Sequence, residues 1–229
     1  MKSDGRIVST ETPHEGRDVI LGRIRSALHD GAAETGGHGH AHEDIPRNYT
    51  PASPDVGTSE IVDLFASRIE GTHATVHRTH AAGVADVVAA IARERKLQCV
   101  IAPAGINPSW TADSIEWVTD DPPLTVDQIE ATDGVLTTAT VATADSGTFV
   151  LDSGPGQGRR ILSLLPDAMI VVLDSQRIVA DFPATIARAD PRRALTFVSG
   201  PSATVDIELS RVDGVHGPRE LDVVIVESS

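Results

Sequence analysis

Aromatic residues are scarce in this chain of 229 residues: Phe, Trp and Tyr together make up 3% of it, whereas hydrophobic residues as a whole make up 40%. A hydrophobic core therefore has to be built mainly from Ala, Val, Ile and Leu. The length is sufficient for one α/β domain with a core of its own and a small helical appendage.

Cysteine is almost absent, since Cys99 is the single one. One cysteine excludes a disulfide within the chain and a cysteine-ligated iron–sulfur cluster held by this chain alone. Cys99 stands in the apolar run 99–102, which favours a small buried residue. We expect no cofactor.

Basic runs of five or more residues and long apolar runs are also missing, and the formal net charge is -14. An acidic chain repels phosphate, which disfavours nucleic acid and anionic membranes as partners. No apolar stretch approaches the ~18 residues of a membrane span. The first residues lack the apolar core of a signal peptide, so we expect a cytoplasmic protein.

Apolar periodicity predicts an alternation of helices and strands. Helices are expected at residues 17–28, 59–70, 84–96, 125–131, 159–165 and 182–189. Strands are expected at residues 74–78, 98–102, 134–144, 148–151, 168–173, 195–198 and 221–226. This order is typical of an α/β fold with a mostly parallel sheet and helices on both faces. The continuously apolar run 168–173 predicts a central strand, and the short connection before 148–151 predicts a hairpin.

A long polar segment, residues 31–56, separates the first helix from the rest. We therefore predict two parts: an N-terminal helix with a flexible His-containing linker (1–56) and an α/β domain (57–229). The linker contains HGHAH, in which His38, His40 and His42 alternate. Imidazoles at this spacing suit zinc, nickel or copper, but the segment has no strand pattern and no acid placed to orient the rings, which favours a solvated loop over a metal site.

Two predicted strands end in the same Ser-Gly-Pro turn, at residues 153–155 and 199–201, and a helix candidate follows each turn. If the strands are parallel neighbours, both turns lie at one edge of the sheet, where backbone N–H groups and arginines can bind a small carboxylate or phosphate. The candidate ligand residues are Gly154, Gly156, Gly158, Arg159, Arg160, Gly200, Ser202, Thr204 and Arg219. Asp206 and Glu208, near the start of the second helix candidate, suit a cation, an amine or a hydroxyl instead.

Two further residues are candidates for chemistry. Asp145 precedes a turn at a strand edge, where it acts either as a nucleophile or base or as the first residue of an Asx turn. His216 stands between two glycines, where it is either a group that takes part in proton transfer or, as the pattern favours, a turn histidine without a chemical role. Since the chain has no Ser-His-Asp signature, no G-x-S-x-G and no H-E-x-x-H, no catalytic residue is assigned.

The blocks SGPSATVDIE (199–208) and GVHGPRELDVVIVE (214–227) resemble those of the LUD-domain family, and within it the LutC type of lactate utilization protein. ADSGTFVLDS (144–153), followed by Arg160, is similar to another block of the same family. The resemblance covers about residues 55–229, and the first helix is similar to the one that opens the LutC type. It implies a fold similar to the NagB/RpiA/CoA-transferase-like group, and a role in oxidising L-lactate to pyruvate with iron–sulfur partner proteins that carry the clusters.

Three hypotheses about function remain open. The first is an auxiliary or small-carboxylate-binding subunit of an L-lactate utilization system. The second is a stand-alone enzyme that acts on an anionic small molecule, as relatives of the fold do; it requires Asp145, Arg159 or Arg160, Asp206 and His216 to converge. The third is a metal-binding module built on the HGHAH segment.

Overall fold

The structure is a computed structural model that describes residues 13–34, 48–204, 212–213 and 217–227. The chain divides into two units, Met1–Tyr49 and Thr50–Ser229. The described element of the first unit is helix α1 (Pro13–Glu34), which is longer than the predicted 17–28. Gly31 does not end it, because one glycine costs a helix only about 1 kcal/mol and the next two residues are alanines.

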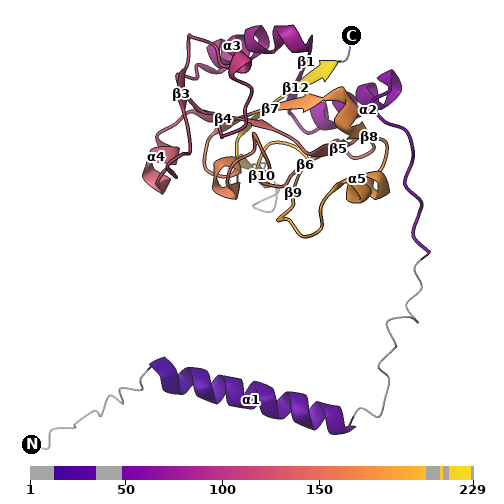
Figure 1. Cartoon of the computed structure of the whole chain (residues 1–229), viewed down its shortest axis with the longest axis vertical. Helices are drawn as coiled ribbons and strands as arrows, with labels where there is room; N and C mark the ends of the chain where they lie inside the picture. The colour runs from indigo at the N-terminus through magenta and orange to yellow at the C-terminus, as the bar shows by residue number, and fades with distance from the viewer. Residues whose placement is uncertain (1–12, 35–47, 205–211, 214–216, 228–229) are drawn as a thin grey trace, which may run out of the picture. The chain divides into compact units, whose positions relative to one another are not determined.

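A six-stranded, fully parallel sheet forms the centre of the second unit, with the strand order β1-β12-β7-β4-β2-β3 (Figure 1). Its strands are β1 (Thr75–His80), β2 (Cys99–Ile101), β3 (Glu116–Val118), β4 (Gly134–Thr138), β7 (Ala168–Asp174) and β12 (Glu220–Glu227). The predicted parallel sheet and the central position of the apolar run in β7 are both confirmed.

Both faces of this sheet are covered, as the alternation of side chains along β7 makes clear. Met169, Val171 and Leu173 belong to one apolar cluster, which includes helix α2 (Ser59–Glu70). Ile170 and Val172 belong to another, which includes helix α3 (Val84–Arg95). Successive residues of a strand point to opposite faces, so α2 and α3 pack on opposite sides of the sheet (Figure 1). The α/β prediction with helices on both faces is confirmed.

A second, four-stranded sheet lies on the α2 side, where Phe149 and Leu151 join the same cluster as Leu173. Its order is β8 (Ile178–Val179), β5 (Val141–Thr143), β6 (Thr148–Leu151), β9 (Thr196–Val198). Helix α5 (Phe182–Arg188) covers its outer face, where Ala184 packs against β-strand valines. The predicted β5–β6 hairpin is confirmed. The predicted strand 134–144 is two strands, since the chain leaves the large sheet after β4 and enters the small one at β5.

Several finer predictions are wrong. Strand β9 runs antiparallel to β6, so the two Ser-Gly-Pro turns lie at opposite ends of the pair. No helix begins at Ser202; the next two residues form the short strand β10 (Ala203–Thr204), paired with β11 (Val212–Asp213). The predicted helix 159–165 is a short 3-10 turn, η3 (Arg160–Ser163).

Two residues expected to be buried are partly open. β9 is an edge strand, and its Phe197 is 41% exposed. Cys99 is partly exposed at the start of the short strand β2.

A further helix of the unit is α4 (Val126–Glu130), which begins with a capping box at Thr125. No helix among the described residues is both long and apolar enough to cross a membrane.

Candidate functional site

A cavity of about 560 Å³ opens where the strands of the large sheet end. We call it the carboxyl-edge cavity. It is lined by Ala81, Gly105, Trp110, Thr138, Ala139, Thr140, Asp152, Gly154, Pro155, Gln157, Val172, Asp174, Arg177, Arg193 and Val226. Thr138 and Asp174 are the last residues of β4 and β7, and Ala81 follows β1 directly. The carboxyl ends of parallel strands are where α/β proteins bind ligands, because the loops that follow converge there.

Two glycine turns form the base of the cavity by packing directly on each other. A side chain on Gly105 would place its Cβ 2.7 Å from the Gly156 nitrogen, and both glycines have positive φ. The Gly156 N–H donates to the carbonyl of Ala104 at 2.9 Å. The Thr138 hydroxyl donates to the carbonyl of Pro155 at 3.2 Å. These contacts fix the loop after β6 against the ends of β2 and β4.

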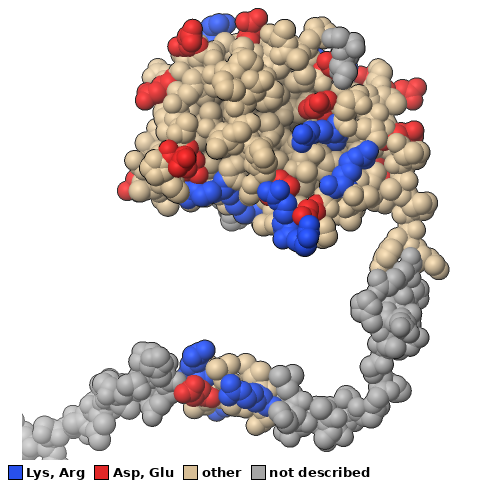
Figure 2. Space-filling view, in the orientation of Figure 1, with Lys and Arg blue, Asp and Glu red and all other residues tan. Residues whose placement is uncertain are grey.

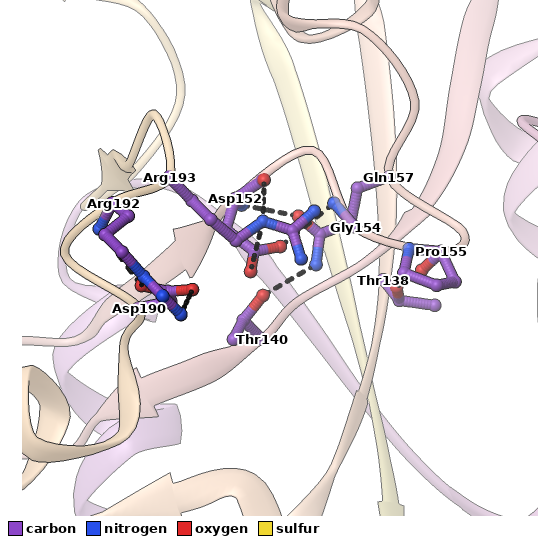
Figure 3. Close-up of polar contacts among 9 residues, drawn as sticks. All are labelled: Thr138, Thr140, Asp152, Gly154, Pro155, Gln157, Asp190, Arg192 and Arg193. Carbon is purple, nitrogen blue, oxygen red and sulfur yellow. Dashed lines mark hydrogen bonds and ion pairs between the residues drawn. The ribbon is translucent and has the colours of Figure 1, made fainter.

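Asp152 is the buried polar centre of the site, and its side chain is 9% exposed. Its Oδ1 accepts the N–H of Gly154 at 2.9 Å. Its own N–H donates to the Oε1 of Gln157 at 2.6 Å, and Gln157 in turn donates to the Thr140 hydroxyl at 2.8 Å. Figure 3 shows these groups close together, with the Arg193 guanidinium lying across Asp152. A buried carboxylate held in this way is a fixed negative anchor for a cation.

Two arginines face the cavity with part of each guanidinium uncommitted. Arg193 uses its Nε, which donates to the backbone carbonyl of Asp152 at 3.0 Å and lies 3.3 Å from its Oδ2. Arg177 uses one Nη, which donates to the carbonyl of Ala139 at 3.1 Å. Among the described residues, no group accepts a hydrogen bond from the two Nη groups of Arg193 or from the remaining N–H groups of Arg177. Guanidinium N–H groups held at the mouth of a cavity are suited to bind a carboxylate or phosphate bidentately.

These arginines matter because the protein as a whole is strongly acidic. Figure 2 shows several Lys and Arg side chains on one face of the Thr50–Ser229 unit, with acidic groups among and around them. The neighbouring Arg192 is differently placed: it forms a separate pair with Asp190, at 3.0 Å, and lies to one side of Asp152 in Figure 3. The adjacent residues Arg192 and Arg193 therefore have different surroundings, and of these two only Arg193 lines the cavity.

A smaller hollow adjoins the cavity and shares Gly154, Pro155 and Arg193 with it. It also contains Arg159, whose Nε and Nη2 donate to the two carboxylate oxygens of Asp120 at 2.6 Å each. The hydrogen bonds from Arg159 hold the pKa of Asp120 below its ordinary value. Arg159 therefore has its Nε and one Nη occupied side by side by a protein carboxylate, so this edge of the guanidinium is not available to bind an external anion bidentately.

The first predicted glycine turn is at the site, but its chemistry differs from the prediction. Gly154 lines both hollows and Gly158 lines the smaller one. The N–H groups of Gly154, Gly156 and Gln157 all donate to protein oxygens. They do not point outward at a ligand as expected, because the loop folds back on Asp152 and on the turn after β2. Because these backbone N–H groups are already hydrogen-bonded within the protein, a ligand at this site would be bound by side-chain N–H groups instead.

The other predicted residues are dispersed. Asp145 is exposed in the β5–β6 turn, at the end of β6 remote from Asp152. The Arg160 guanidinium donates to the Thr196 hydroxyl. Gly200 packs on Thr72, beside the end of α2.

Three more lie elsewhere in the unit. Ser202 donates its N–H to the carbonyl of Pro218, and Thr204 is in β10. Arg219 pairs with Asp167 at the amino end of β12, on the opposite edge of the large sheet. Asp206, Glu208, His216 and the HGHAH segment lie outside the described residues. Within the described ranges no group of three or more His, Cys, Asp or Glu side chains could hold a metal ion.

Sequence reasoning missed the residues that line the cavity beyond the first glycine turn. They are Thr138, Thr140, Asp152, Gln157, Arg177 and Arg193. A usable signal existed for Asp152, which follows a predicted strand and precedes a glycine two positions on, the spacing of an Asx turn. For the two arginines there was none, since each follows an unremarkable polar turn and the register of the second sheet decides where it points.

Comparison with known proteins gives consistent matches. The model of the LUD domain family matches residues 62–226. Lactate utilization protein C of Deinococcus radiodurans is 39% identical over 181 residues, which span 77% of this chain and 84% of the relative. The protein of the same name from Shouchella clausii is 34% identical, but the match spans 48% of this chain and 51% of that relative.

A solved structure is similar as well. The crystal structure of a DUF162 family protein from Deinococcus radiodurans matches with a TM-score of 0.62 and 33% identity, covering 73% of this chain and 97% of that one.

Proposed function

Because this chain belongs to the LUD domain family, we propose that it takes part in lactate utilization, as a subunit that binds a small carboxylate in the carboxyl-edge cavity. Its partners in this proposal are iron–sulfur proteins that oxidise L-lactate to pyruvate. The single cysteine agrees with such a division of labour, because clusters ligated by cysteine would reside in the partners. No residue of this chain is assigned a catalytic role.

The observation that carries the proposal is the pair Arg177 and Arg193 at the mouth of the cavity. Lactate offers a carboxylate for the guanidinium groups and a hydroxyl for a polar neighbour, and Thr138 and Thr140 line the same cavity. Asp152 holds Arg193 through Nε, so that both Nη groups can face a carboxylate in fork geometry. A guanidinium that is already oriented loses little side-chain entropy on binding, which favours affinity for a small ligand.

Complementation tests this function. A Deinococcus radiodurans strain lacking its own lactate utilization protein C is supplied with the present chain, and growth and L-lactate consumption are measured. We expect the wild-type chain to restore both, the double variant Arg177→Gln/Arg193→Gln to fail, and Arg192→Gln to succeed, because Arg192 pairs with Asp190 outside the cavity. If the chain accumulates but does not restore lactate consumption, the proposal is wrong, and the reading as a separate enzyme for another anion gains support.

A further inference from the structure

The carboxyl-edge cavity is larger than the ligand that the proposed function assigns to it. Its volume is about 560 Å³. A hydroxy acid with six non-hydrogen atoms, at about 30 Å³ for each water-sized group, fills about a third of that space. Cavities of several hundred cubic ångströms are typical of sites for much larger molecules. Something besides a small acid can therefore be accommodated.

The two ends of the cavity have different chemistry because they come from different layers of the fold. Asp152, Arg177 and Arg193 all belong to segments of the second sheet: they follow β6, precede β8 and precede β9. Val172 belongs to the apolar cluster on the α3 face of the large sheet, and Val226 packs against that cluster. The cavity thus reaches across the carboxyl edge, from charged residues of the second sheet to apolar residues on the α3 face of the large sheet.

Trp110 closes the apolar end. It is the last residue of the 3-10 turn η2 (Pro108–Trp110), in the connection between β2 and β3. It is partly buried against the cluster of Val172 and Ile170, and it lines the cavity. Within the part of the chain that the structure describes, no group accepts a hydrogen bond from its indole N–H. Trp110 and Val226 line the same cavity, and the indole offers a flat surface for a ring and a spare donor.

We propose that the cavity takes a single ligand with an anionic group at one end and a flat aromatic ring at the other. The anionic group, a carboxylate or a phosphate, binds Arg177 and Arg193, and the ring packs on Trp110 and Val226. This rests on the proposed function for the anionic end, where the lactate carboxylate binds, and extends it to the part of the cavity that lactate leaves unfilled. Stacking and apolar burial of a ring strengthen binding beyond what the anion alone provides.

Calorimetric titration of the full chain with matched probes tests the ligand class. The probes are L-lactate (an anion alone), 2-naphthoate and 2-naphthyl phosphate (an anion with a ring), and 2-naphthalenemethanol (a ring alone). We expect one of the two anionic ring compounds to bind at least tenfold more tightly than both L-lactate and the alcohol, and to be displaced by L-lactate. The two compounds distinguish a carboxylate from a phosphate.

Variants separate the two ends of the cavity. Trp110→Ala should lower the affinity for the anionic ring compound about tenfold and leave the affinity for L-lactate unchanged. Arg193→Gln should lower both. Trp110→Phe, which keeps a ring, should retain most of the affinity, and circular dichroism verifies folding of each variant. If the ring adds nothing to wild-type affinity while L-lactate binds, the inference is overturned and the proposed function stands. If L-lactate does not bind while the ring compound does, the proposed function fails at the level of its ligand.

Discussion

Two carboxylates, Asp222 and Asp167, show how burial determines how much an ion pair contributes to the stability of the fold. Asp222 is 3% exposed in its side chain; its Oδ1 lies 2.9 Å from the Nε2 of His77, and its Oδ2 lies 3.1 Å from the Nε of Arg95. This network ties α3 to β1 and β12. Asp167 forms a pair with Arg219 of similar length, 2.9 Å, but both side chains are more than half exposed.

We therefore expect Asp222→Ala to lower the free energy of unfolding by about 1–3 kcal/mol, because it removes the buried acceptor shared by His77 and Arg95, although Arg95 keeps its contact with Glu220. Asp167→Ala, the matched control, should cost about 0–1 kcal/mol, since water screens an exposed pair. Urea denaturation of the two variants and the wild type measures both values. Equal losses would contradict this account of the network.

At the scale of elements, most of the large sheet could be predicted from the sequence. The run in β7 is apolar on both faces, which is typical of a central strand in a parallel sheet that is covered on both sides. The second sheet could not be predicted, because the alternating pattern of residues 134–144 is continuous through the point where β4 ends and β5 begins. Periodicity reports which residues are buried, but it does not report which of two layers buries them.

The same limit explains the outcome at the candidate site. The first glycine turn could be predicted because backbone positions with positive φ favour glycine, so such a turn appears in the sequence as a cluster of glycines. The antiparallel pairing of β6 with β9 could not be predicted, because the direction of the edge strand β9 depends on a connection of more than forty residues between Leu151 and Thr196. That direction separates the two Ser-Gly-Pro turns and brings Arg193 to Asp152.

At the scale of the whole molecule, the prediction to be tested is that the α/β part is a complete folding unit. The composition predicts a boundary between residues 56 and 57, whereas the contacts divide the chain between Tyr49 and Thr50. All the apolar clusters found among the described residues are built from Val56 onward. Deletion of residues 1–49 should then change the free energy of unfolding by less than about 0.5 kcal/mol. Urea midpoints of the full chain and of Thr50–Ser229 measure this, and a large loss would mean that α1 belongs to the folded core.

The central claim is that Arg177 and Arg193 bind a carboxylate at the carboxyl edge of the sheet. Isothermal titration of L-lactate into the full chain measures it most directly, with Arg193→Gln and Arg177→Gln as test variants and Arg192→Gln as the control. The account predicts one site per chain, a loss of affinity of about 10- to 100-fold in each test variant, and no change in the control. Wild-type affinity in both test variants, or an absence of binding to the wild-type chain, would contradict it.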